Sequence, residues 1–375
     1  MSKVKVLLIS PYSAKQIGGI GTWSKVMLDY CEGRDDVNLK FQNTQSSLKG
    51  NMQLQHGKLR RLVLGCWDSL TILVKEFWNI MIFRPEVVHY TSSASWALAK
   101  DRVAAFIAVT IFRRKFIIHW RCGTFTREYN ANSKLFQRWM NVIRHSTCSI
   151  FIDKQDYVTA QKIGIKNACL IPNPISSHLQ LRSENLAVDS IQTQRHEGEV
   201  LFVGQILKTK GALELMRVCA KNPNVRKLLL AGPCLHEMRA ELEGIAKTRE
   251  GNWYEFLGEL KREDVFKYYE KCNVFCLPTY TEGFPNVILE SMAHACPIVT
   301  TPVGAIPEML EEESGITVPV QDEEALDKAL TEVLTHRGES LEMGKRARKR
   351  VLKNYTIDVV YKQYHNLWTN SYCDR

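Results

Sequence analysis

The feature that most constrains this chain is the regular alternation of short apolar runs with segments of helical spacing. The run Val4–Ser10 (VKVLLIS) is typical of a buried strand, a glycine-containing loop follows, and Thr22–Tyr30 carries apolar residues at helical intervals. The pattern continues with predicted strands at Val87–Tyr90 and Phe116–Trp120 and predicted helices at Leu70–Phe83 and Val103–Phe112. Strands that alternate with helices predict a mostly parallel α/β sheet.

A second series of the same kind follows the polar segment Ser176–Glu199, which has little periodicity and is predicted to be a linker. Its strands are predicted at Val200–Val203, Lys227–Ala231, Tyr254–Phe256, Val274–Leu277 and Ile298–Thr300, and its helices at Ala212–Ala220, Leu235–Ala246, Arg262–Lys271, Val287–Ala293, Glu323–Leu334 and Ser340–Leu352. A chain of 375 residues also exceeds the roughly 250–300 residues at which one core stops growing. We therefore predict domains at 1–175 and 176–354, with 355–375 a terminal helix that packs back on the first.

Charge divides unevenly between these halves. The chain carries +10 overall, but residues 1–175 hold 25 Lys/Arg against 11 Asp/Glu, whereas residues 176–375 hold 25 against 29. The basic first half suits either an ordinary solvated surface or an anionic membrane. Nucleic acid is not expected as a partner, because no nucleic-acid-binding motif is visible.

Composition and the positions of the cysteines narrow the class of protein. With 45% apolar and 24% charged residues, the chain resembles soluble globular proteins and not disordered or fibrous ones. Its 11 cysteines include no C-x-x-C pair, which favours free thiols in a reducing compartment over a metal site. Neither a signal peptide nor an apolar stretch of membrane-spanning length is apparent, so we expect a cytoplasmic protein.

The strongest chemical signal runs from Tyr280 to Glu290. Pro285 suits the first position of a helix, whose free amides and positive end would face a site above the preceding strand and favour an anion. Glu282 would lie on the loop beside this site. Glu290, about two turns along the helix, could accept hydrogen bonds from a pair of hydroxyls. Taken alone, the two glutamates also fit a helix with one capping and one surface carboxylate. The sequence therefore suggests a ligand with hydroxyls at both ends and phosphates in the middle, which describes a nucleotide-sugar.

The wider context contains a series of motifs. They are Gly18-Gly19, Ile171-Pro172-Asn173, Phe202-Val203-Gly204 with Lys210-Gly211, Ala231-Gly232, Glu282-Gly283-Phe284-Pro285-Asn286 with Glu290-Ser291-Met292-Ala293, Pro297-Ile298-Val299-Thr300-Thr301, Gly304-Ala305-Ile306-Pro307-Glu308 and Gly315-Ile316-Thr317-Val318-Pro319. Together they resemble the retaining glycosyltransferases of family 4. That resemblance implies the GT-B fold, in which two Rossmann-like domains face each other across a cleft.

The resemblance also implies a role for each matching position. Glu290 would bind the donor ribose, Glu282 would contact the transferred sugar as a catalytic residue, and Lys210 would neutralise the pyrophosphate. The remaining donor-binding positions would be Gly18, Gly19, Gly204, Gln205, Gly283, Phe284, Pro285, Asn286 and Val287. A leaving nucleoside diphosphate gains negative charge in the transition state, so a lysine and a helix N-terminus are also what the chemistry requires. Neither a metal nor a cofactor is expected.

Two positions depart from the family pattern. The family commonly has an arginine where this chain has Gln205, and Lys208 is one candidate to replace that charge. Aligning the stretch after the strand at Phe116–Trp120 puts Arg121 at the position of the usual catalytic histidine, with His119 two residues earlier on the same strand face. We rank Arg121 ahead of His119 as the residue near the donor sugar, and a structural role for His119 remains open.

These observations predict an enzyme, a hexosyltransferase-type glycosyltransferase (EC 2.4). It would move a sugar from a nucleoside-diphosphate donor to a glycan or lipid-linked hydroxyl, with retention, in cell-surface polysaccharide synthesis (lipopolysaccharide or capsule). It would be cytoplasmic, with peripheral contact to the inner face of the plasma membrane through the basic first domain. The alternatives are a Rossmann oxidoreductase, disfavoured because the spacing of Gly18, Gly19 and Gly21 is not G-x-G-x-x-G, and a non-catalytic nucleotide-sugar-binding protein.

Overall fold

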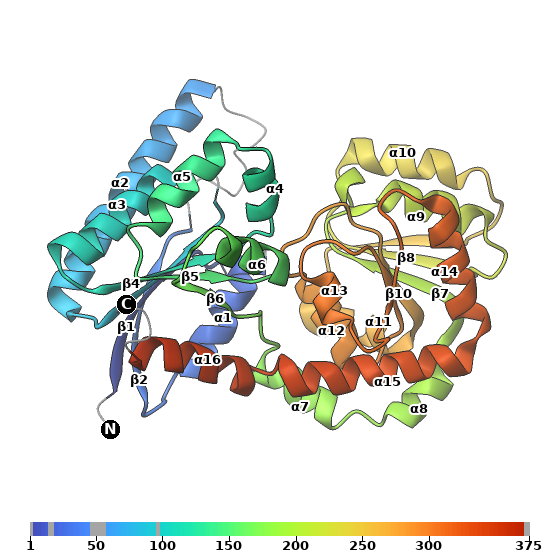
Figure 1. The fold of residues 1–375 in the computed structure, drawn as a ribbon. Coiled ribbons are helices and arrows are strands. Elements are labelled where there is room, and N and C mark those ends of the chain that lie inside the picture. Colours follow the sequence, from blue (N-terminus) through green and yellow to red (C-terminus); the bar gives the residue numbers. More distant parts are fainter. Residues whose placement is uncertain (1–2, 14–18, 46–57, 95–97, 371–375) are drawn as a thin grey trace. The chain divides into compact units, whose positions relative to one another are not determined.

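The computed structural model describes residues 3–13, 19–45, 58–94 and 98–370. The chain divides into two compact units, the first made of residues 1–174 with 360–375 and the second of residues 175–359. Each unit contains a six-stranded sheet in which all neighbouring strands are parallel, with helices on its faces (Figure 1). This is the α/β class that the alternating pattern predicted.

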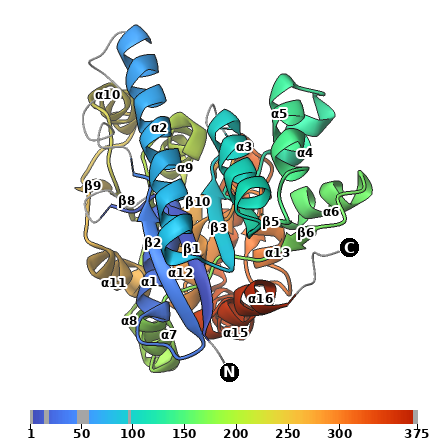
Figure 2. The ribbon, with the colours of Figure 1, turned by 90° about the vertical axis from the view of Figure 1, so that its left-hand side faces the viewer.

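The first unit contains β1 (Val4–Ser10), α1 (Gly19–Cys31), β2 (Val37–Asn43), α2 (Lys58–Phe83), β3 (Val87–Ser92), α3 (Leu98–Phe106), the π-helical turn η1 (Ile107–Ile111), β4 (Lys115–Trp120), α4 (Phe125–Asn130), α5 (Lys134–Ile143), β5 (Cys148–Phe151), α6 (Lys154–Lys162), β6 (Ala168–Leu170) and most of α16 (Ile357–Thr369). Its strand order is β2-β1-β3-β4-β5-β6. Because the chain reverses direction across the sheet after β2, right-handed crossovers put α1 on one face and α2, α3 and α5 on the other (Figures 1 and 2).

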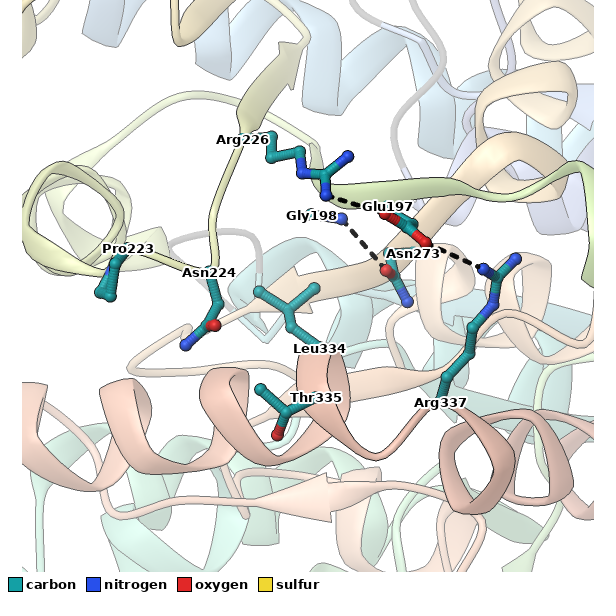
Figure 3. Close-up of a pocket in the computed structure, with 9 residues that line it drawn as sticks. All are labelled: Glu197, Gly198, Pro223, Asn224, Arg226, Asn273, Leu334, Thr335 and Arg337. Carbon is teal, nitrogen blue, oxygen red and sulfur yellow. Dashed lines mark hydrogen bonds and ion pairs between the residues drawn. The ribbon is translucent and has the colours of Figure 1, made fainter.

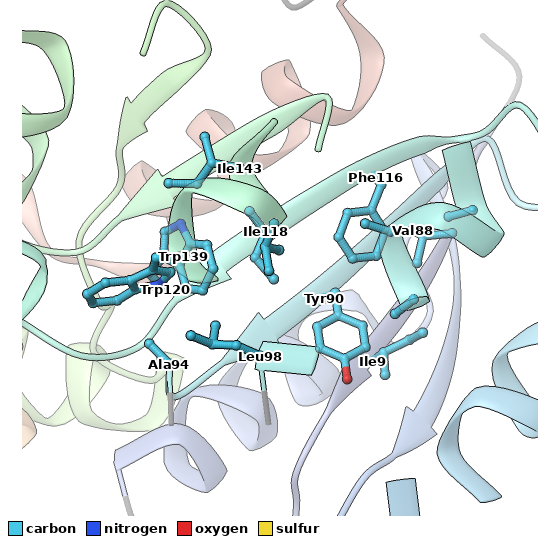
Figure 4. Packing of buried hydrophobic residues seen from close by; sticks show 14 of the residues in the cluster. Ile9, Val88, Tyr90, Ala94, Leu98, Phe116, Ile118, Trp120, Trp139 and Ile143 are labelled. Carbon is cyan, nitrogen blue, oxygen red and sulfur yellow. The ribbon is translucent and has the colours of Figure 1, made fainter. Parts of the chain in front are cut away.

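The core of this unit lies between the sheet and the α2–α3–α5 layer. Tyr90, Ile118 and Trp120 project from β3 and β4 toward Leu98 and Trp139 (Figure 4), and the two tryptophan rings meet edge to face at 5.3 Å. All five side chains are buried. Strands covered on both faces must be apolar on both, which explains why the sequence showed continuous apolar runs instead of alternation.

The second unit contains α7 (Ser177–Glu184), α8 (Val188–Gln194), β7 (His196–Val203), the 3₁₀ turn η2 (Lys208–Lys210), α9 (Ala212–Lys221), β8 (Lys227–Ala231), α10 (His236–Ala246), β9 (Tyr254–Gly258), α11 (Arg262–Lys271), β10 (Cys272–Leu277), α12 (Asn286–Ala293), β11 (Ile298–Thr300), α13 (Ile306–Met309), β12 (Ile316–Thr317), α14 (Glu323–Thr335) and α15 (Arg337–Asn354). Its strand order is β12-β11-β10-β7-β8-β9. Relabelled from the first strand of the unit, this is 6-5-4-1-2-3, the order of a Rossmann fold.

Several local predictions were wrong. The predicted linker at 176–199 contains α7, α8 and the start of β7. Only Leu179 and Ser183 of α7 are buried, so the helix gives little apolar periodicity, although Ser176 caps it by accepting a hydrogen bond from the Leu179 N–H. The helix predicted at Val103–Phe112 is α3 followed by the π-helical turn η1, and α2 begins twelve residues before the prediction, at Lys58.

The last helix returns to the first unit. From Val360 onward α16 belongs to that unit, where Tyr361, Tyr364 and Trp368 are buried. The Tyr364 hydroxyl accepts a hydrogen bond of 3.2 Å from the Trp23 indole N–H on α1. Thus α1 and the end of α16 share one face of the sheet.

Two further observations concern membranes and thiols. Within the described parts of the chain, no helix combines the length and the apolar character that crossing a membrane requires. The ten cysteines in those parts are free thiols, and six of them are buried.

Candidate functional site

The candidate site lies at the point in the second unit where the chain reverses across its sheet. β7 is followed outward by β8 and β9, and β10 then pairs with the other side of β7. The loops at the carboxyl ends of β7 and β10, residues 204–211 and 278–285, therefore leave the sheet side by side. Ligands of open α/β sheets bind at such a switch point.

Backbone contacts join these two loops. Gly211 has φ of +72°, and a Cβ there would lie 2.0 Å from the Pro278 carbonyl oxygen. The Tyr280 N–H donates to the Thr209 carbonyl at 2.9 Å. Gly211 is therefore required both by its left-handed backbone and by the closeness of the neighbouring strand end.

Lys210 and Glu282 meet where the loops join. The Lys210 Nζ lies 2.5 Å from Glu282 Oε1, and both side chains are mostly buried, with exposed fractions of 25% and 15%. The structure thus brings together two residues that the sequence separates by 72 positions. Each neutralises the charge of the other.

A third loop, after β11, supports the Glu282 segment. Gly304 has φ of +57°, and a Cβ there would lie 2.3 Å from the Glu282 carbonyl oxygen. The Ala305 N–H donates to the Gly283 carbonyl at 2.9 Å. The conformation of the loop is therefore fixed from both sides.

The helix α12 begins directly after this loop. Pro285 is its N-cap, one position earlier than predicted, and makes no side-chain capping bond. Phe284 is buried and packs edge to face on Tyr355 at 5.7 Å, which anchors the start of the helix, while Asn286 and Val287 in the first turn are partly exposed. The positive end of α12 thus lies beside the Lys210–Glu282 pair.

Glu290 lies further along α12 and is 7% exposed. Its Oε1 forms an ion pair of 2.7 Å with Arg262, the first residue of α11. A carboxylate can accept about four hydrogen bonds, so this pair orients Glu290 and leaves acceptor capacity for other donors.

The rest of the β7 loop makes backbone contacts and faces solvent. Gly204 has φ of +145°. A Cβ on Gly232 would lie 1.9 Å from the Gly204 carbonyl oxygen, so the loops after β7 and β8 touch at these two glycines. Gln205 is exposed. Lys208 forms an exposed ion pair with Glu241 of α10 at 3.1 Å, so in this structure its charge is directed to α10 and not to Lys210.

The two candidates of the first unit are in one network. His119 on β4 is fully buried, and its Nε2 lies 3.1 Å from the Arg121 guanidinium. Its Nδ1 lies 3.2 Å from Nε2 of His89 on β3, and His89 Nδ1 accepts from the Trp368 indole N–H at 3.1 Å. Arg121 also stacks over the Trp23 ring at 4.9 Å. Sequence reasoning missed His89 and Trp368.

Burial keeps both imidazoles neutral. It lowers the pKa of His89 to about 3 and the pKa of His119 well below its ordinary value, with the Arg121 charge acting in the same direction. Burial lowers the pKa of Arg121 to about 10, so the guanidinium stays charged at neutral pH. The three contacts are Trp368–His89, His89–His119 and His119–Arg121. They contain four hydrogens, one each from the Trp368 indole, the Arg121 guanidinium and the two neutral imidazoles. One contact is therefore a donor facing a donor, and Arg121, the most exposed of the four residues, is the group best able to turn away.

A separate hollow of about 330 Å³ lies at the opposite, amino-terminal end of the second sheet (Figure 3). Arg226 and Arg337 both point into it, but both are ion-paired with Glu197, at 2.8 and 3.5 Å. None of the candidate residues of the switch point lines this hollow, so we do not place the site here.

Most of the second unit is similar in sequence to a known family. Residues 188–350 match the family glycosyl transferases group 1. The matched segment contains both switch-point loops, α12 and Arg262.

Relatives and solved structures similar to this chain were also found. The chain is 27% identical over 232 residues to a capsular polysaccharide biosynthesis glycosyltransferase, CapM of Staphylococcus aureus, a match that covers 60% of this chain and 59% of that protein. Sucrose-phosphate synthase from Thermosynechococcus elongatus is similar in fold, with a TM-score of 0.71 at 20% identity over 98% of both chains. Anabaena Alr3699/HepE in complex with UDP-glucose gives 0.68 at 15% identity, over 97% of this chain and 98% of that one. The chain therefore has the GT-B fold, with the segment that matches group 1 preceded by a second Rossmann-like unit.

Gly18 lies outside the described residues, and Gly19 is the exposed first residue of α1. Arg262, which pairs with Glu290, was not predicted as a site residue, because its position at the start of a helix gave no functional signal.

Proposed function

We propose that this protein is a retaining glycosyltransferase that moves a hexosyl group from a nucleoside-diphosphate-sugar to a hydroxyl of a glycan or lipid-linked acceptor. The observation that carries this proposal is the Lys210–Glu282 pair at the switch point of the segment that matches group 1, beside the start of α12. A cation, a carboxylate and a helix N-terminus together suit a diphosphate joined to a sugar.

In the proposed reaction, the acceptor oxygen bonds to the anomeric carbon as the bond from that carbon to the phosphate oxygen breaks. The nucleoside diphosphate leaves with the electron pair, and one of its phosphate oxygens takes the acceptor proton. Lys210 and the amides of the first turn of α12 stabilise the charge that builds on the leaving group. No resident metal is proposed, because these groups supply the positive charge.

Lys210 and Glu282 exchange partners in this proposal. The incoming diphosphate takes Lys210, and Glu282 is released to accept a hydrogen bond from the transferred sugar. Glu290, held by Arg262, accepts from the ribose hydroxyls. The partner exchange couples arrival of the diphosphate to exposure of the catalytic carboxylate.

Arg121 and His119 are proposed to serve the sugar from the first unit. When Arg121 turns away from His119, two donors no longer face each other, and the His119 Nε2–H can donate a hydrogen bond to a sugar oxygen. Trp368 and His89 fix this tautomer, because the indole N–H can only donate.

The biological setting is proposed from the relatives. CapM is a capsular polysaccharide biosynthesis enzyme, and HepE has been solved with UDP-glucose. We propose cell-surface polysaccharide assembly as the pathway, a cytoplasmic location, and peripheral contact with the membrane that holds a lipid-linked acceptor.

A donor panel tests the function. The purified chain is mixed with UDP-, GDP-, ADP- and dTDP-hexoses, with and without candidate acceptors, and the release of nucleoside diphosphate is followed. One donor should give acceptor-dependent release, and the product should keep the anomeric configuration. Binding of a donor without turnover would instead indicate a non-catalytic nucleotide-sugar-binding protein, and a thermal shift with NAD alone would favour an oxidoreductase.

A further inference from the structure

The outward side of α2 is apolar along most of its length. Val63, Trp67, Leu70, Val74, Trp78 and Ile82 recur at intervals of three and four residues, so they form one stripe, the α2 stripe, about 28 Å long. Trp67, Trp78 and Ile82 are 64%, 53% and 69% exposed. The opposite side of the helix supplies the core with Leu73, Phe77 and Ile80. The stripe is therefore additional to the residues that hold α2 on the sheet.

The apolar surface continues onto the neighbouring elements. The helix α2 packs beside α3 (Figures 1 and 2) and η1. These two elements carry the exposed residues Val103, Phe106 and Ile111. Soluble proteins rarely leave so many large apolar side chains together in water. This face needs a partner.

Charged residues around the face are almost all basic. Lys75, Arg84, Arg102 and Arg113 are exposed. The acids of α2 and α3 are turned inward, since Glu76 and Asp101 are buried, and Asp68 is only partly exposed. Glu86, exposed at the start of β3, accepts a hydrogen bond from the Lys5 N–H. The face thus presents apolar and cationic groups together.

A groove between α3 and α5 repeats this chemistry. It has a volume of about 610 Å³, and its lining includes Val103 and Phe106 together with Arg102, Arg138 and His145. The described residues of α5 include no acid. Such a groove suits a phosphate headgroup joined to hydrocarbon.

We propose that the outer face of α2, α3 and η1 docks this protein on an anionic phospholipid bilayer. Tryptophans at the headgroup level, aliphatic side chains below them and flanking arginines are the pattern of a helix that lies in the plane of a membrane. A second copy fits less well, because a two-fold contact through this face would bring like charges together. Nucleic acid would leave Val63, Leu70, Val74 and Ile82 exposed.

Flotation with lipid vesicles tests the proposal on the full chain. The wild type should bind vesicles of phosphatidylcholine with phosphatidylglycerol at least about tenfold better than phosphatidylcholine alone, and salt should weaken that binding. The double variant Trp67→Ser/Trp78→Ser should lose at least about tenfold in vesicle affinity. Leu235→Ser, which removes a side chain 59% exposed in the second unit, should change nothing.

A variant that removes two positive charges tests the electrostatic contribution to vesicle binding. Arg102→Gln/Arg113→Gln should weaken binding to anionic vesicles by about tenfold or more and leave binding to neutral vesicles unchanged. Lys221→Gln/Lys247→Gln, which removes the same charge from exposed positions of the second unit, should have no effect. All variants should melt like the wild type because the changed side chains are exposed.

The proposal is overturned if the tryptophan variant floats as well as the wild type, or if neither vesicle type binds. It is also overturned if the lipid-free protein forms a concentration-dependent dimer that the tryptophan variant abolishes, which would make this face a protein interface. The inference deepens the proposed function, but its readout is binding without any donor. Failure of donor turnover and failure of docking are therefore distinguishable.

Discussion

Replacing Gly211 by alanine tests whether the contact between the β7 and β10 loops holds the site together. The new Cβ would lie 2.0 Å from the Pro278 carbonyl oxygen, whereas real Cβ atoms keep at least 3.0 Å, so one loop must move by about 1 Å. That movement separates Thr209 from Tyr280 and Lys210 from Glu282. Misplacement of about 1 Å in a catalytic site can cost about a hundredfold in rate.

The expected loss of stability has two parts. A left-handed alanine costs about 1–2 kcal/mol, and overlap in a packed region adds about 1–3 kcal/mol. Gly258→Ala is the matched control, because Gly258 has φ of +69°, close to that of Gly211, and no atom within 4 Å of its added Cβ. It should show only the first part, about 2–4 °C of melting temperature per kcal/mol.

Thermal unfolding and titration with the nucleoside diphosphate of the active donor provide the assay. Gly211→Ala should melt below Gly258→Ala and should lose most donor turnover, whereas Gly258→Ala should keep turnover. The reasoning is refuted if the two variants have the same melting temperature and the same turnover. In that case the contact with Pro278 would not position Lys210.

Two further predictions concern charged groups. Glu282→Gln removes the partner of Lys210, so the affinity for free nucleoside diphosphate, measured by calorimetry, should rise up to about fivefold, as expected for a partly exposed ion pair of about 1 kcal/mol. The rate of sugar transfer should fall. The control Glu270→Gln, which breaks the ion pair with Arg182 elsewhere in the same unit, should change neither the affinity nor the rate. Glu76 is buried without a hydrogen-bond partner among the described residues, and burial raises its pKa to about 8 from the ordinary 4.5. The folded state then binds more protons than the unfolded state between these values, so stability should fall as pH rises from about 4.5 to about 8; Glu76→Gln should flatten this slope in denaturant titrations, and an unchanged slope would contradict the assignment.

Some elements were predicted with their correct bounds. β8, β11 and α11 have the predicted bounds, because a buried parallel strand is a continuous apolar run and a surface helix has a clear period. The edge strands β2 (VNLKFQN) and β6 were not predicted, since most of their residues are only partly buried. The helices α7 and α8 were not predicted for a related reason, because few of their residues are buried.

The site was predictable only in part. The resemblance identified Lys210, Glu282 and Glu290 individually, but the contact across 72 positions between Lys210 and Glu282 depends on the pairing of β7 with β10. The pair of Glu290 with Arg262 depends on how α11 packs beside α12. The His89–Trp368 bond joins residues 279 positions apart and depends on the return of α16 to the first unit. Tertiary structure alone creates these links.

The most direct test of the central claim is donor turnover by Lys210→Ala and Glu290→Ala, each measured with the donor that the panel identifies. We predict that each variant loses most of the acceptor-dependent release of nucleoside diphosphate while its melting temperature stays close to that of the wild type. Full activity in both folded variants would contradict the assignment of the donor site to the switch point of the second unit.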